Sequence, residues 1–355
     1  MKRMKRTEMP EMNRTERPEG QDAEDRPETM KQTGLTGRPE RQDAEDRPET
    51  AEGSGSTDRR EACLTGTILR GIGSFYTVRE DGTGTDRVLR AKKKFRRASI
   101  SPLPGDRVLF LPGEEEEQGW IEEILPRKTL CLRPPVANVE TLVIVLAPVP
   151  EADLLLTDRQ LARAFHQGMK AILAVNKSDL DPDLARKLAE EYAPAGVPVF
   201  GVSALEESGL EPLRRAMEGS LCCLTGQSGA GKSTLLNALL GLRLETGEIS
   251  RKIARGKNTT RHVELIERDG LRVMDTAGFS LLEPEKDLPP EQLKERYPEF
   301  APYEGKCRFR ECLHDREPGC LVAEAAAEGA VHPARWQRYR QLLAETRENW
   351  KARYD

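Results

Sequence analysis

Apolar and polar positions follow three different patterns along this chain of 355 residues. The first segment, residues 1–58, contains almost no aliphatic or aromatic side chains, and it repeats residues 17–29 as residues 38–50 with one substitution. A segment of this composition cannot bury enough apolar surface to offset the entropy of ordering it. We therefore predict a disordered tail over residues 1–58.

Short runs of alternating apolar and polar residues follow, from Ala62 to about Leu125. Glycine, aspartate and proline separate them, which is typical of strands joined by turns. The predicted strands cover residues 63–69, 75–78, 87–90, 108–111 and 120–124. About five strands in roughly 65 residues are the size of a small barrel, and we expect an OB-fold.

Beyond this region, buried-looking strands alternate with amphipathic helices. The pattern predicts strands over residues 142–147, 170–175, 198–202 and 221–224, and helices over residues 158–167, 183–191 and 210–217. Strands separated by helices indicate a doubly wound α/β sheet. A last helix is expected over residues 332–354, with its aromatic residues packed and its arginines facing phosphate or water.

A phosphate-binding loop lies at the end of the fourth strand of this series. Its GxxxxGK[ST] spacing stands between an apolar run and a helical pattern, as the motif requires. The glycines let backbone N–H groups face phosphate oxygens at the helix N-terminus. Lys232 is expected to reach the β- and γ-phosphates, and the Ser233 hydroxyl to ligate Mg²⁺. The predicted triphosphate-binding residues are Gly226, Gln227, Ser228, Gly229, Ala230, Gly231, Lys232, Ser233 and Thr234.

Two further loops predict that the base is guanine. Asp179, in the sequence Asn176-Lys177-Ser178-Asp179, can accept hydrogen bonds from N1–H and N2–H₂ of guanine, a donor pair that adenine lacks. Asn176 is expected to contact N7 and the adjoining loop, and the Lys177 stem to cover the base. A backbone N–H of Ser203-Ala204 is expected to meet O6. A remote alternative is an ATPase in which the NKxD sequence occurs by chance. In that case the substitution Asp179→Ala would leave the preference between GTP and ATP unchanged.

The elements that contact the γ-phosphate follow the phosphate-binding loop. Asp275 begins a DxxG sequence and is expected to hold Mg²⁺ through water, and the Gly278 N–H to meet the γ-phosphate. Thr259 or Thr260 is expected to ligate Mg²⁺, with Thr260 favoured. Because NKxD and Ser-Ala precede the phosphate-binding loop, the domain is predicted to be circularly permuted. All these loops still lie at the carboxyl ends of one sheet.

Two other clusters suggest binding. The spacing Cys-x4-Cys-x-His-x5-Cys supplies three thiolates and an imidazole, a set suited to a structural zinc ion; the alternative is three unligated thiols and a surface histidine. The predicted zinc ligands are Cys307, Cys312, His314 and Cys320. A basic run around Phe95 could follow an RNA backbone with Phe95 stacking, or could be a solvated loop. Its RNA-contact candidates are Lys92, Lys93, Lys94, Arg96 and Arg97.

The composition excludes some classes of protein. The formal net charge is −4, so any nucleic-acid-binding face must be local. No run of 18 apolar residues occurs, so no membrane span is expected, and no apolar stretch follows the basic N-terminus, so no secretory signal is expected. The cysteine distribution suits a reducing cytosol better than a disulfide framework.

The chain resembles the family of small ribosomal subunit biogenesis GTPases called RsgA, YjeQ or YloQ. The likeness covers about residues 60–352, and it is carried by the sequences at residues 133–139, 176–179, 226–234, 259–265, 275–279 and 307–320. It implies an RNA-binding OB domain (59–127), a circularly permuted GTPase domain (128–288) and a zinc-binding helical domain (289–355), whereas the tail (1–58) lies outside the resemblance.

The resemblance implies a cytoplasmic GTPase that acts late in maturation of the 30S subunit and is stimulated by that subunit. Its expected partners are the 30S subunit with its 16S rRNA and GTP or GDP, with Mg²⁺ and one structural zinc ion as cofactors, and a monomer is expected. Asn258 stands where similar sequences commonly carry a histidine, and it is the candidate for positioning water, with His262 as the alternative. Phe279 follows DxxG and cannot orient water. A very slow or non-catalytic GTP-dependent rRNA-binding switch therefore remains the alternative.

Overall fold

The computed structural model describes residues 63–113, 119–132, 135–241, 263–276 and 288–353. The predictions for the 1–58 tail, Asn258, Thr259 or Thr260, Gly278 and Phe279 lie outside these residues. Within the described ranges, no helix has both the length and the apolar character needed to cross a membrane.

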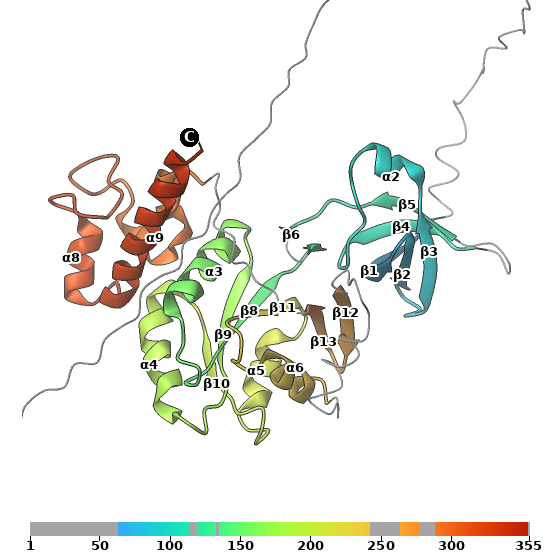
Figure 1. The fold of residues 1–355 in the computed structure, drawn as a ribbon, viewed down its shortest axis with the longest axis horizontal. Coiled ribbons are helices and arrows are strands. Elements are labelled where there is room, and N and C mark those ends of the chain that lie inside the picture. Colours follow the sequence, from blue (N-terminus) through green and yellow to red (C-terminus); the bar gives the residue numbers. More distant parts are fainter. Residues whose placement is uncertain (1–62, 114–118, 133–134, 242–262, 277–287, 354–355) are drawn as a thin grey trace, which may run out of the picture. The chain divides into compact units, whose positions relative to one another are not determined.

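Five strands close a barrel in the first part of the described chain (Figure 1). They are β1 (Leu64–Ile72), β2 (Phe75–Glu80), β3 (Asp86–Ala91), β4 (Arg107–Leu111) and β5 (Gly119–Ile124). The strand order is β1-β2-β3-β5-β4, and a further β1–β4 pairing closes it; β3 and β5 are parallel. Alternate positions on the strands fill the interior, among them Ile68, Val78, Leu89, Phe110 and Ile121. The predicted OB-fold barrel is confirmed.

The basic run between β3 and β4 forms a short helix, α2 (Lys93–Arg97), instead of an open loop. Phe95 is 8% exposed and packs in the barrel core. One turn of helix directs this ring inward while Lys93 and Lys94 stay exposed. The expectation that Phe95 stacks on RNA is therefore wrong. Lys92 forms an ion pair with Glu122, and the side chain of Arg96 lies outside the described part.

The second sheet region has the order β10-β9-β8-β11-β13-β12. Its strands are β8 (Thr141–Leu146), β9 (Lys170–Val175), β10 (Val199–Gly201), β11 (Leu221–Thr225), β12 (Val263–Arg268) and β13 (Leu271–Thr276). All neighbours are parallel except β12 and β13. This confirms the doubly wound α/β sheet. The pattern did not predict β12 or the small hairpin of β6 (Leu130–Leu132) and β7 (Pro135–Ala137).

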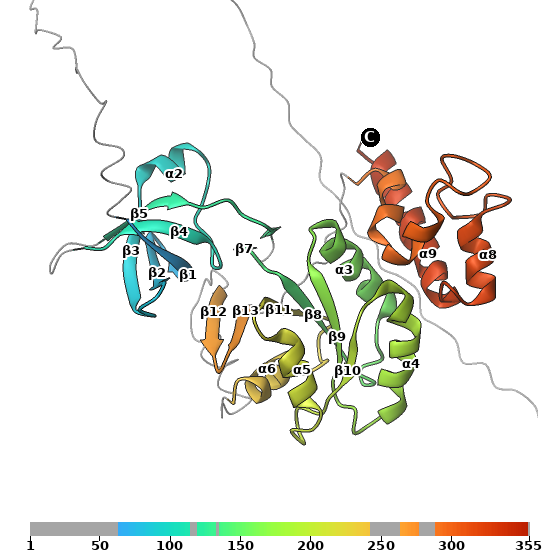
Figure 2. The same cartoon turned by 180° about the vertical axis from the view of Figure 1, so that it is seen from behind.

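Helices cover both faces of this sheet (Figures 1 and 2). α3 (Leu154–His166) and α4 (Pro182–Tyr192) pack on one face, and α5 (Leu210–Met217) and α6 (Lys232–Leu239) pack on the other. The side chains of Asp153 and Asp181 accept hydrogen bonds from N–H groups in the first turns of α3 and α4, which fixes where these helices begin.

The C-terminal part contains α8 (Leu321–Glu328) and α9 (Pro333–Lys351), and the short 3₁₀ helices η2 (Pro290–Gln292), η3 (Lys294–Arg296) and η4 (Pro298–Tyr303); η1 (Ala193–Ala195) follows α4. Tyr297, Phe300 and Tyr339 make ring contacts in its core. Trp336 and Tyr339 of α9 pack in this core as expected. Two arginines of α9 do not face phosphate or water as predicted, since Arg335 is 2% exposed, Arg338 is mostly buried, and both are ion-paired; Arg353 is exposed.

Candidate nucleotide site and metal cluster

Four functional loops of the predicted nucleotide site follow strands of the same sheet. The NKxD residues follow β9, the Ser203-Ala204 loop follows β10, the phosphate-binding loop follows β11, and Asp275 lies near the end of β13. Because β10, β9, β8, β11 and β13 are neighbours and run parallel, these loops meet at one edge of the sheet. The structure thus brings together the described residues predicted to bind nucleotide, although they are permuted in the sequence.

The phosphate-binding loop needs glycine where the backbone is closely approached. Gly226 has a φ of 129°, and a Cβ there would lie 2.2 Å from the Val145 carbonyl oxygen. Gly231 has a φ of 90°, and a Cβ there would lie 2.3 Å from Asn176 Nδ2. The loop leads directly into α6, whose first residue is Lys232. Lys232 Nζ donates to the carbonyl oxygens of Gly226 and Gln227, both at 2.8 Å, so the ammonium group is held over the loop.

Gln227 joins the phosphate-binding loop to the start of α3, a contact that the sequence motif did not predict. Its Oε1 accepts from the backbone N–H of Asp153 at 2.8 Å, and its Nε2 donates to the Glu151 carbonyl at 2.8 Å. Lys177 spans the same region, since its Nζ donates to the carbonyls of Val149 at 2.6 Å and Gly229 at 2.9 Å. The phosphate-binding loop is therefore held from both the NKxD loop and the α3 N-terminus.

Asn176 is buried, and it connects the phosphate-binding loop to the loop after β10. Its Nδ2 donates to the Ala230 carbonyl at 3.0 Å, and its Oδ1 accepts from the Ala204 N–H at 3.0 Å. The Ser203 N–H donates to Ser208. Both N–H groups expected near guanine O6 are thus hydrogen-bonded within the protein. The O6 contact stays a prediction, and it requires one of these bonds to be shared or exchanged.

The groups expected to contact the base, the phosphates and Mg²⁺ differ in exposure among the described residues, with Lys232 and Asp275 partly buried. Asp179 and Ser233 are exposed, and within the described ranges no side chain pairs with Asp179. Burial lowers the pKa of Lys232. Burial, followed by the nearby Glu264 carboxylate, raises the pKa of Asp275. A bound polyphosphate would stabilise the Lys232 ammonium, and a divalent cation would stabilise the Asp275 carboxylate.

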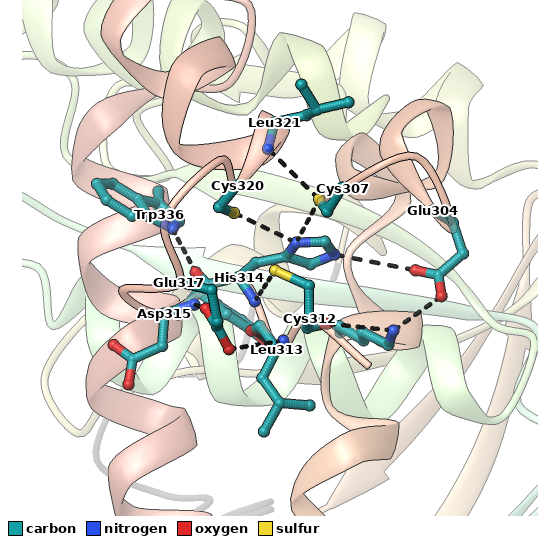
Figure 3. Close-up of polar contacts among 12 residues, drawn as sticks. Glu304, Cys307, Cys312, Leu313, His314, Asp315, Glu317, Cys320, Leu321 and Trp336 are labelled. Atoms are coloured by element: carbon teal, nitrogen blue, oxygen red, sulfur yellow. Dashed lines mark hydrogen bonds and ion pairs between the residues drawn. The ribbon is translucent and has the colours of Figure 1, made fainter. Parts of the chain in front are cut away.

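The four predicted zinc ligands come together in the C-terminal part (Figure 3). The Sγ atoms of Cys307, Cys312 and Cys320 and the His314 imidazole all lie within 4.8 Å of one another. His314 Nδ1 lies 3.5 Å from Cys320 Sγ and 3.7 Å from Cys307 Sγ. Zinc bonds of about 2.0–2.1 Å to nitrogen and about 2.3 Å to sulfur give a tetrahedral N···S edge of roughly 3.5 Å. These two N···S distances match that edge, and the whole donor set is compact enough for a tetrahedral zinc ion to be held by small side-chain shifts.

The surroundings of this cluster also fit a metal. The Leu321 N–H donates to Cys307 Sγ and the His314 N–H donates to Cys312 Sγ, both at 3.4 Å, and such donors stabilise thiolates. Burial raises the pKa of the thiols of Cys312 and Cys320. Burial, helped by Lys294, lowers the pKa of His314 and keeps the imidazole in the neutral form that binds metals. Zinc binding would displace the thiol protons.

The strand order and the loops together define a circularly permuted P-loop GTPase fold that follows an OB-fold barrel. Family models agree with this class: the RsgA GTPase model matches residues 124–285, and the RsgA N-terminal domain model matches residues 65–121.

Curated relatives match over most of the chain. A protein of Ruminiclostridium cellulolyticum named small ribosomal subunit biogenesis GTPase RsgA is 43% identical over 281 residues, which are 78% of this chain and 92% of that protein. The protein of the same name from Caldanaerobacter subterraneus is 39% identical over 298 residues, 82% of this chain and 98% of its own length.

Two solved structures have the same architecture. YjeQ from Thermotoga maritima superposes with a TM-score of 0.69 at 32% identity, covering 80% of this chain and 98% of that chain. YloQ, described as a circularly permuted GTPase, superposes with a TM-score of 0.68 at 30% identity, covering 81% and 96%. The chain belongs to the RsgA GTPase family, and its activity class is GTP hydrolysis.

Proposed function

We propose that this protein binds GTP at the carboxyl edge of the doubly wound sheet and hydrolyses it to GDP and phosphate during late maturation of the 30S small ribosomal subunit, which stimulates hydrolysis. The observation that carries the proposal is the meeting of the NKxD, Ser-Ala, phosphate-binding and DxxG loops at one edge despite their permuted order. Relatives named small ribosomal subunit biogenesis GTPases match over nearly their whole length.

In this proposal each described residue has a defined role. The Lys232 ammonium group replaces its hydrogen bonds to two loop carbonyl oxygens by bonds to β- and γ-phosphate oxygens. The Asp179 carboxylate accepts hydrogen bonds from the N–H groups of guanine. Ser233, Asp275 and Thr260 would hold Mg²⁺, which would supply neutralisation of the charge that develops on the phosphates. Gly278, Thr260 and the water-positioning candidate Asn258 belong to the sequence outside the described residues, so their roles rest on the motifs.

A slow or non-catalytic GTP-dependent rRNA-binding switch remains a second candidate. It is favoured by two residues of the sequence, Asn258 before the switch threonines and Phe279 after DxxG, because neither is the group usually expected to orient a water molecule. The two candidates share the nucleotide site and differ in turnover.

Association with the subunit tests the proposed partner. The protein with a non-hydrolysable GTP analogue is expected to co-sediment with isolated 30S subunits and not with 50S subunits. Lys232→Ala, which removes the phosphate-binding ammonium group, is expected to weaken the analogue-dependent part of this association. Equal sedimentation with both subunits, or none with either, would contradict the ribosomal role. Sedimentation of the same preparation in the absence of subunits tests whether the protein is a monomer, as expected.

We also propose that the Cys307–Cys320 cluster holds one structural zinc ion. Protein purified without added zinc is expected to contain one zinc atom per chain, and Cys312→Ser is expected to lose it and to expose the C-terminal part to proteolysis. Structural zinc contributes about 10–16 kcal/mol in small zinc peptides, so the effect on this part should be large. Cys63→Ser, outside the cluster, is the matched control. A zinc content well below one atom per chain, or full metal retention in Cys312→Ser, would disprove the site.

A further inference from the structure

Helix α3 packs into two cores of the protein, that of the doubly wound sheet and that of the C-terminal part. Leu161 and Ala164 of α3 belong to the core on one face of the sheet. Ala162 belongs to the core of the C-terminal part, and Leu155 packs against that core. Because protein cores are closely packed, α3 cannot shift against one of them without disturbing the other.

Polar contacts join one side of α3 to the C-terminal part. The buried carboxylate of Asp158 accepts hydrogen bonds from Arg335 and Arg338 of α9, both at 2.6 Å. Arg159, the next residue of α3, forms an ion pair with Glu345 of the same helix. Charge-assisted hydrogen bonds are short and depend strongly on geometry, so these contacts hold α9 in one position along α3.

The other side of α3 contacts the start of the phosphate-binding loop. Gln160 is 1% exposed, and its Nε2 donates to Thr225 Oγ1 at 3.0 Å. Thr225 is the last residue of β11 and directly precedes Gly226. Asp158 and Gln160 are two positions apart, which corresponds to about 200° around a helix axis, so their side chains leave opposite sides of α3.

Packing alone does not explain a glutamine at position 160. Within the described part of the chain, the Gln160 Oε1 atom is buried and has no hydrogen-bond partner. A buried polar atom without a partner destabilises a protein, and a methionine of similar length would avoid this loss. The hydrogen bond to Thr225 therefore accounts for the glutamine better than the packing of α3 does.

The first turn of α3 makes a second contact with the phosphate-binding loop. The Gln227 side chain accepts from the Asp153 N–H, and the Asp153 side chain accepts from the Leu156 N–H at 2.9 Å. The residue bonded to Gln227 is thus also the N-cap of α3. Asp153 and Asp158 are about 7.5 Å apart along the axis, at a rise of about 1.5 Å per residue. The loop contact and the α9 contact therefore lie within about one and a half turns of one helix.

Nucleotide binding, in the proposed function, acts directly on Gln227. The Lys232 ammonium group donates to the Gln227 carbonyl oxygen and replaces this bond by bonds to phosphate oxygens. Backbone N–H groups of the loop then close on the phosphates. The position of the Gln227 main chain is thereby set by the nucleotide, while its side chain stays bonded to the start of α3.

We propose that α3 couples the phosphate-binding loop to the C-terminal part, with Gln160 and Gln227 as positioning residues at the loop and Asp158 as the positioning residue at α9. This inference rests on the proposed function, which supplies the guanine nucleotide. A nucleotide that orders the loop also orders α3, and an ordered α3 holds the arginines of α9. By linkage, the packing of α9 on α3 strengthens nucleotide binding by the same factor.

The first test measures binding of a fluorescent, non-hydrolysable β,γ-imido GTP to the full-length protein. Gln160 is buried and outside the expected nucleotide contacts, and Gln160→Met keeps the side-chain length while removing the hydrogen bond. We expect it to weaken binding at least about 5-fold, the lower end of the usual coupling between sites, with no loss of thermal stability. Asp158→Ala, on the other side of α3, should weaken binding in the same way. The double variant should bind no more weakly than the weaker single variant, because both substitutions break one connection.

The second test measures the opposite direction of the coupling by hydrogen exchange of the α9 backbone, residues 333–351. The β,γ-imido GTP should slow exchange in the wild-type protein, and Gln160→Met should lose most of this protection. Thr141→Val is the matched control, because it also replaces a buried polar residue of the same sheet region, and its Oγ1 has no partner among the described residues. Thr141 is the first residue of β8, at the end of the strand away from the nucleotide loops, so affinity and protection should be unchanged.

Wild-type affinity in either Gln160→Met or Asp158→Ala would overturn the coupling, and so would exchange in α9 that does not respond to nucleotide in the wild-type protein. A loss of affinity in Thr141→Val as large as in Gln160→Met would overturn the positioning role of Gln160. Failure of the wild-type protein to bind a guanine nucleotide would refute the proposed function. Normal, GTP-selective binding without protection of α9 would refute only this inference.

Discussion

Replacing Asp158 by alanine is expected to lower the free energy of unfolding of the C-terminal part by about 3–5 kcal/mol, because three buried donors lose the charged acceptor that they share. Asp158 lies on α3 with a fully buried side chain, and it accepts from Arg335 Nη1 and Arg338 Nε of α9, both at 2.6 Å. It also accepts from the Tyr192 hydroxyl at 2.9 Å. The substitution leaves two buried guanidinium groups without their shared partner.

The remaining carboxylates of this cluster cannot take over. Glu299 is bound to Arg335 Nε at 2.6 Å, and Glu191 is paired with Arg338. Denaturant unfolding followed by tryptophan fluorescence is sensitive to this part of the protein, because two of the three tryptophans, Trp336 and Trp350, lie on α9 and Trp336 donates to the His314 carbonyl. Glu211→Gln, which breaks an exposed ion pair on α5, should change stability by no more than about 1 kcal/mol. A loss in Asp158→Ala as small as in this control would show that the cluster does not hold α9 against α3.

Replacing Asp179 by alanine is expected to weaken GTP binding about 10²- to 10⁴-fold. The carboxylate would accept two hydrogen bonds from guanine, each worth about 1.5–3 kcal/mol for a charged acceptor, and its loss also leaves two donors of the base unpaired. ATP offers no such donor pair, so its weak affinity should not change. Because Asp179 is exposed, folding should be unaffected.

Titration of the full-length protein with GTP and with ATP measures this effect, with Asp183→Ala as the control. Asp183 is an exposed carboxylate in the first turn of α4, close in the sequence and outside the expected base contacts. Equal losses of affinity for the two nucleotides, or an unchanged preference for GTP in Asp179→Ala, would show that guanine is selected elsewhere.

Much of the fold could be predicted because its elements follow from patterns among residues that are close in the sequence. Strand alternation identified the barrel, and apolar runs followed by loop motifs located β8, β9, β10 and β11 to within a few residues. The permuted order of the loops followed directly from the sequence. The cysteine and histidine spacing gave four ligands that the structure places within reach of one another.

The features that the sequence did not indicate depend on contacts between distant segments. Asp158 and Arg335 are 177 positions apart, so no local pattern could show that α9 carries buried arginines. The inward direction of Phe95 depends on the single turn of α2 and on the barrel interior beneath it. Likewise, Asn176 can form hydrogen bonds with Ala230 and Ala204 only because the two loops that carry these residues meet at the edge of the sheet.

The most direct test of the central claim is the rate of GTP hydrolysis by the full-length protein, alone and with stoichiometric 30S subunits, with 50S subunits and ATP as controls. We expect slow hydrolysis by the protein alone, strong stimulation by 30S subunits only, and no comparable hydrolysis of ATP. GTP-dependent binding to 30S subunits without any increase in turnover would contradict the claim and would identify the protein as a nucleotide-dependent RNA-binding switch.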